Sequence, residues 1–76
     1  MVVQVYSTAA CPYCHMAKEY LTSKGVAYQN IDVSVDQEAS KKMVEISGQM
    51  GVPVIVVDGK PIVGFDKMAI DAALGA

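Results

Sequence analysis

The sequence has no arginine and no tryptophan, and among its 76 residues there are only two cysteines and one histidine. Six lysines stand against eight acidic residues, for a net charge of -2, so the chain lacks the basic surface that nucleic-acid binding needs. No apolar run approaches the length of a membrane span, and residues 1–5 lack the basic start of a signal peptide. We therefore expect one cytoplasmic, monomeric domain, residues 1–76, that binds neither nucleic acid nor membranes.

The two cysteines, Cys11 and Cys14, are separated by only two residues. Small secreted domains that are held together by disulfides carry roughly four or more cysteines at wider spacing. A disulfide that closes so small a ring contributes only about 2 kcal/mol in the chain-entropy model. Stability alone therefore does not explain the pair, and a chemical role has to be considered.

Apolar patterning, caps and turns predict seven elements in the order βαβαββα. Pro12 suits the first position of a helix, which makes Cys11 its N-cap, and Asp58-Gly59 suits the tight turn of a hairpin. The predicted elements are strand 2–6, helix 12–24, strand 26–33, a helix from a Ser34–Gln37 capping box to a point near Gly48, strands 54–57 and 60–63, and a helix capped by Asp66. This order predicts an α/β fold, a four-stranded mixed sheet with helices on both faces.

Cys11, Cys14 and the adjacent His15 also fit two kinds of metal site. All three side chains can bind zinc, but a closed structural site needs four ligands, and the chain has no further cysteine or histidine. The segment also matches the C-x-x-C-H pattern of covalent haem attachment, whereas a strand directly before the cysteines is typical of a redox dithiol. We expect no bound cofactor or metal, and a metal-binding module that uses Cys11 and Cys14 stays as an alternative.

A reversible dithiol is the interpretation that the predicted elements favour. Cys11 lies where a helix begins, so unpaired N–H groups and the positive end of the helix dipole favour its thiolate form. Cys14 lies about one turn further along the same helix, within reach of Cys11 and better shielded from solvent. We therefore predict that Cys11 attacks a substrate disulfide and that Cys14 resolves the mixed disulfide.

The chain resembles the glutaredoxin family over nearly all of its length. The resemblance is carried by Tyr6-Ser7, Cys11-Pro12-Tyr13-Cys14, Gly51-Val52-Pro53-Val54 and Val63-Gly64-Phe65-Asp66. It implies a thioredoxin-like fold and a thiol–disulfide oxidoreductase, an electron carrier that reduces protein or glutathione mixed disulfides. Glutathione is the co-substrate that this resemblance implies.

The resemblance also implies roles for residues other than the cysteines. Pro53 is expected to follow a cis peptide and to lie against the cysteines, with Val52 offering its backbone to an extended substrate. Gly64 and Asp66 are expected to contact the γ-glutamyl end of glutathione, although N-capping explains Asp66 equally well. The expected substrate-binding residues are Tyr13, Val52, Pro53, Gly64, Phe65 and Asp66.

Two departures from the family pattern leave the reductant open. Glutaredoxins commonly have a lysine three residues before the first cysteine, whereas this chain has Thr8 and so less positive charge for glutathione carboxylates. Gly64-Phe65 is similar to the glutaredoxin-like proteins that reduce ribonucleotide reductase and are recharged by thioredoxin reductase, although their usual Trp-Ser is here Ile62-Val63. The expected partners are disulfide-containing proteins, with glutathione, thioredoxin reductase or both as reductant.

Overall fold

The computed structural model describes residues 2–75 and has the predicted element order. The elements are β1 (Val3–Ser7), α1 (Pro12–Ser23), β2 (Gln29–Asp32), α2 (Gln37–Ser47), β3 (Val54–Val57), β4 (Lys60–Val63) and α3 (Lys67–Leu74). In this described part of the chain, none of the helices is both long and apolar enough to cross a membrane.

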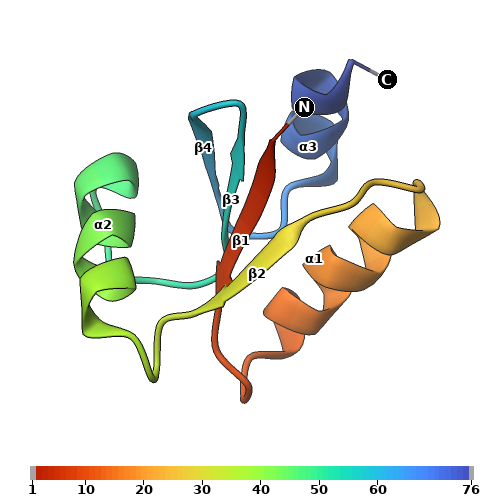
Figure 1. Cartoon of the computed structure of the whole chain (residues 1–76). Helices are drawn as coiled ribbons and strands as arrows, with labels where there is room; N and C mark the ends of the chain where they lie inside the picture. Colours follow the sequence, from red (N-terminus) through yellow and green to blue (C-terminus); the bar gives the residue numbers. More distant parts are fainter. Residues whose placement is uncertain (1, 76) are drawn as a thin grey trace.

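The four strands form one mixed sheet in the order β2-β1-β3-β4. Strands β1 and β2 are parallel, as a crossover through α1 requires, whereas β3 pairs antiparallel with both β1 and β4. Helices α1 and α3 cover one face of the sheet and α2 covers the other (Figure 1). The predicted α/β fold with helices on both faces is therefore confirmed, and it is the thioredoxin-like fold.

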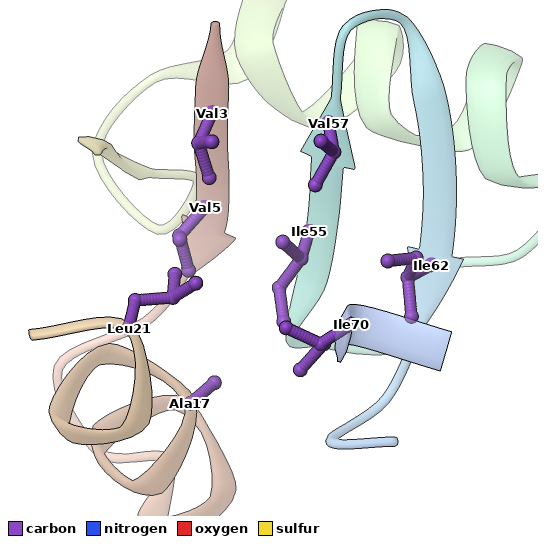
Figure 2. Close-up of a cluster of buried hydrophobic side chains, with 8 residues drawn as sticks. All are labelled: Val3, Val5, Ala17, Leu21, Ile55, Val57, Ile62 and Ile70. Carbon is purple, nitrogen blue, oxygen red and sulfur yellow. The ribbon is translucent and has the colours of Figure 1, made fainter. Parts of the chain in front are cut away.

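The two central strands carry apolar residues on both faces, so each face has its own core. Successive side chains of a strand point to opposite faces, which sends Val5 toward α1 and α3 and its neighbour Tyr6 toward Met43 of α2. Figure 2 shows the larger cluster, which consists of Val3, Val5, Ala17, Leu21, Ile55, Val57, Ile62 and Ile70. Because Ala17 and Leu21 are completely buried in it, α1 is held firmly on the sheet with its first turn at the end of β1.

The hairpin between β3 and β4 turns at Asp58-Gly59, as predicted. Both residues have positive φ, 49° and 86°, which is the requirement of a type I′ turn. The N-cap predicted for α3 is also confirmed, since the Asp66 carboxylate accepts a hydrogen bond from the N–H of Ala69 at 3.1 Å.

The capping box predicted at Ser34 and Gln37 is wrong. The N-cap of α2 is Asp36, whose carboxylate accepts a hydrogen bond from the N–H of Ala39 at 3.0 Å. Ser34 instead donates its hydroxyl and its N–H to Asp32 Oδ1, at 2.5 and 2.9 Å, and these bonds hold the pKa of Asp32 below its usual value. Because Asp32 holds Ser34 in a turn, β2 ends before the predicted residue 33 and the cap of α2 moves to the next carboxylate.

Candidate active site

Cys11 is the N-cap residue of α1, as predicted, with extended backbone angles and Pro12 directly after it. Its Sγ accepts a hydrogen bond from the backbone N–H of Cys14 at 3.2 Å. That N–H is one of the donors left without a partner inside a helix at its first turn, a place that oxygen-bearing caps usually fill. A sulfur in this position meets an N–H donor at the positive end of the helix.

Cys14 has a different environment, since its side chain is 0% exposed whereas Cys11 is partly exposed. Burial, and next the hydrogen bond with Cys11, raise the pKa of Cys14 to about 11, against smaller opposing contributions that include a backbone hydrogen bond from Thr8 and the charge of Lys18. Both cysteines are free in this structure. The reduced pair thus consists of an accessible sulfur at a helix start and a buried sulfur that keeps its proton at neutral pH.

The loop before β3 borders Cys11. The carbonyl oxygen of Val52 lies 3.9 Å from Cys11 Sγ, the peptide bond between Val52 and Pro53 is cis, and Pro53 is buried. Within residues 2–75 the N–H of Val52 has no hydrogen-bond partner. The structure therefore places Val52 beside the first cysteine, with Pro53 directly after it, and leaves the N–H of Val52 available.

The turn between β4 and α3 is joined to the same loop. The N–H of Gly64 donates to the carbonyl oxygen of Pro53 at 2.8 Å, so Gly64 is held next to the expected substrate site. Phe65 packs edge-on against Tyr20 of α1, with 5.8 Å between ring centroids. The Asp66 carboxylate is engaged in capping α3 but is exposed to solvent.

Tyr13 and His15, the other polar residues of the Cys-x-x-Cys-His segment, lie in different environments: Tyr13 faces solvent, and His15 is hydrogen-bonded to the backbone of Ala9. Tyr13 is 62% exposed and stands on the surface of the first turn of α1. His15 places Nε2 3.2 Å from the carbonyl oxygen of Ala9, and because a carbonyl only accepts, this nitrogen donates. Among residues 2–75 no group of three or more His, Cys, Asp or Glu side chains is arranged to hold a metal ion. The hydrogen bond from His15 to Ala9 joins the first turn of α1 to the loop before Cys11.

Gln49 is a residue near the site to which the sequence analysis gave no role. Its side chain forms two hydrogen bonds with the backbone of Gly51, directly before Val52. A glutamine two residues ahead of a glycine belongs to no capping or turn pattern, so only the folded structure reveals the contact.

A βαβαββα fold that carries two cysteines at the start of its first helix, with a cis-proline next to the residue that borders the first of them, defines a thioredoxin-like dithiol protein. The sequence profile of the Glutaredoxin family matches residues 3–62. The chain therefore belongs to the glutaredoxin family of thiol–disulfide oxidoreductases.

Known proteins resemble the chain over almost its whole length. An uncharacterized glutaredoxin-like 8.6 kDa protein of the rubredoxin operon of Clostridium pasteurianum is 44% identical over 70 residues, 92% of this chain and 93% of that protein. Glutaredoxin 3 of Escherichia coli K12 is 39% identical over 74 residues, 96% of this chain and 89% of that protein. The solved structure of a buckwheat glutaredoxin–glutathione complex matches with a TM-score of 0.77 and 26% identity, over 96% of this chain and 69% of that one.

Proposed function

We propose that this chain is an electron carrier that reduces protein disulfides and glutathione mixed disulfides through Cys11 and Cys14. The observation that carries the proposal is the Cys14 N–H bonded to Cys11 Sγ at 3.2 Å at the start of α1, with the Cys14 thiol itself buried. This arrangement supports an attacking thiolate and a protonated reserve thiol in one helical turn. The proposal includes a cytoplasmic location and a monomeric chain, which the sequence predicts.

The reaction proceeds in two exchanges. The Cys11 thiolate attacks one sulfur of the substrate disulfide, that S–S bond breaks, and the other sulfur leaves as a thiolate that takes a proton from water. Cys14 then loses its proton and attacks Cys11 Sγ, which forms the Cys11–Cys14 disulfide and releases the substrate thiol. The substrate gains two electrons and the dithiol loses two.

The contacts of Cys14 help to order these two exchanges. The hydrogen bond and the negative charge of Cys11 both raise the pKa of Cys14 in the reduced protein. A mixed disulfide at Cys11 carries neither the charge nor the acceptor thiolate, so these two contributions disappear and the pKa of Cys14 falls. Burial, the largest cause, remains. The resolving thiol therefore becomes more reactive only after Cys11 has captured a substrate.

An extended substrate is proposed to pair with the backbone of Val52. The N–H of Val52 is unpartnered within the described chain and its carbonyl lies 3.9 Å from Cys11 Sγ, which supports the addition of a short strand next to the reacting sulfur. Tyr13 and Pro53 are the other proposed contacts of the substrate; Tyr13 is 62% exposed in the first turn of α1, whereas the ring of Pro53 is buried directly after Val52.

Glutathione is the proposed co-substrate, with Gly64, Phe65 and Asp66 near its γ-glutamyl end. The similarity to the buckwheat glutaredoxin solved with glutathione supports this proposal, and so does the hydrogen bond that joins Gly64 to Pro53. A second candidate is recharging by thioredoxin reductase, which is favoured by Thr8 in place of the common lysine and by Phe65 after Gly64.

The reductant is tested by incubating the oxidised protein with glutathione, or with thioredoxin reductase and NADPH, and counting free thiols. We expect glutathione to restore both thiols; restoration by the reductase alone would replace our first candidate with the second.

The dithiol mechanism is tested separately with two variants and a glutathionylated peptide. Cys14→Ser is expected to accumulate a mixed disulfide at Cys11, whereas Cys11→Ser is expected to form none. A Cys11→Ser protein that still reacts would contradict the proposed roles.

A further inference from the structure

The side-chain carboxamide of Gln49 forms two hydrogen bonds with the backbone of Gly51. Gln49 Nε2 donates to the carbonyl oxygen of Gly51 at 2.8 Å, and the N–H of Gly51 donates to Gln49 Oε1 at 2.6 Å. A carboxamide that engages both polar groups of one residue fixes the orientation of that peptide segment, because two bonds define a direction that a single bond leaves free. We call this pair of hydrogen bonds the Gln49–Gly51 clamp.

The clamp explains why residue 51 is a glycine. Gly51 is not among the glycines with positive φ, so its backbone does not by itself exclude a side chain. A Cβ atom added at this position would lie only 2.6 Å from Gln49 Oε1, closer than non-bonded atoms approach. Because the atom in the way is the end of a flexible side chain, an alanine is tolerated once the Gln49 side chain swings out. Gly51→Ala therefore removes the clamp without straining the backbone.

The clamp connects the loop that precedes β3, which contains Gly51 and Val52, to the end of α2. The helix ends at Ser47, whose hydroxyl donates to the carbonyl oxygen of Met43 at 2.6 Å and accepts a hydrogen bond from the N–H of Gln49 at 3.4 Å. Helix α2 thereby holds the main chain of Gln49, and Gln49 holds Gly51. The next residue is Val52, whose carbonyl oxygen lies 3.9 Å from Cys11 Sγ.

We propose that Gln49 is a positioning residue, which holds Val52 in the orientation that an extended disulfide substrate needs to pair with it beside Cys11. This inference rests on the proposed function. It assigns to the Gln49 carboxamide a part in substrate recognition at a distance from the reacting sulfurs, since Gln49 touches Gly51 and not the thiols. A small disulfide that does not pair with the Val52 backbone has no need of the clamp.

The test is a double-mutant cycle with two substrates. The parent, Gln49→Ala, Gly51→Ala and the double variant are reduced and mixed with a peptide glutathionylated at a central cysteine, or with 2-hydroxyethyl disulfide. We expect each single substitution to lower the second-order rate constant for the peptide about threefold to tenfold, the range expected for lost neutral hydrogen bonds. The double variant is expected to be no slower than the single variants, because both changes remove the same clamp.

The controls separate positioning from a general loss of structure. Gln37→Ala removes an exposed glutamine at the first turn of α2 and is expected to leave both rate constants unchanged. All variants are expected to keep the parent rate with 2-hydroxyethyl disulfide, and amide hydrogen exchange at Gly51 and Val52 is expected to accelerate in the clamp variants. Gln49→Glu, which keeps the acceptor oxygen but loses the donor, is expected to resemble Gln49→Ala.

If the double variant slows the reaction with the peptide by the product of the two single effects, the two substitutions act independently. That result would overturn the role of Gln49. Equal slowing with both disulfides, or no slowing with the peptide, would overturn it too. If the parent protein reacts with neither disulfide, the proposed function itself fails, an outcome that is distinct from a reactive parent whose clamp variants do not behave as expected.

Discussion

Raising the pH from 8 toward 11 is expected to weaken the fold of the reduced protein through Cys14. Burial, and next the hydrogen bond with Cys11, raise the pKa of this thiol from 9.0 to about 11, so the folded chain holds the proton more tightly than the unfolded chain does. The stabilisation is fully present below pH 9 and is lost as the pH rises through the pKa of the folded state. A difference of this size corresponds to about 2 to 3 kcal/mol, which is a large share of the stability of a small domain.

Urea unfolding of the reduced protein at pH 8 and at pH 11 measures this loss. Tyr20 and Lys24 also have raised pKa values in the folded protein and so add to the pH dependence of stability, and Cys14→Ala serves as the matched control that keeps both. We expect the parent to lose about 2 to 3 kcal/mol more than Cys14→Ala between the two pH values. An equal loss in the two proteins would refute the assignment of a raised pKa to the buried thiol.

Three further substitutions test separate parts of the account. Cys11→Ala is expected to lower the pKa of Cys14, because the hydrogen bond and the charge of Cys11 are removed while burial, the largest cause of the raised pKa, persists; the ultraviolet absorbance of the thiolate against pH measures this pKa, and an unchanged value would show that Cys11 contributes nothing. Asp66→Asn is expected to keep the cap of α3 and the stability, whereas Asp66→Ala loses about 1 kcal/mol in urea unfolding. If Asp66 also binds the ammonium group of glutathione, both variants raise the KM for glutathione, and an unchanged KM in Asp66→Asn would leave the residue with capping alone. Leu21→Ala, in the core below α1, is expected to cost about 2 to 5 kcal/mol, and a loss below 1 kcal/mol would contradict the packing shown in Figure 2.

Local chemistry was enough to predict the element order and the position of the first cysteine. Pro12 at the first helical position makes Cys11 the N-cap, and Asp58-Gly59 forces the hairpin, because each depends only on neighbouring backbone angles. The start of α2 was misplaced because three acceptors, Asp32, Ser34 and Asp36, compete for donors within five residues. Which of them reaches a donor depends on where β2 releases the chain, and that is fixed by pairing with β1.

Tertiary contacts account for what the sequence could not predict at the candidate site. The spacing of Cys11 and Cys14 identifies the dithiol, but the high pKa of Cys14 follows from its burial in the folded chain and from its hydrogen bond with Cys11. The approach of Val52 to Cys11 joins residues that are 41 positions apart. The clamp at Gly51 is local in sequence, yet it depends on a side-chain orientation that no propensity encodes.

The difference between the two thiols is tested most directly by limited alkylation. The reduced protein is treated at pH 7 with less than one equivalent of iodoacetamide, and the modified cysteine is located by peptide mass spectrometry. With its pKa raised to about 11, the Cys14 thiol is almost entirely protonated at this pH, and its sulfur is buried. We predict that the label is found almost entirely on Cys11; equal labelling of the two cysteines, or a preference for Cys14, would contradict the account.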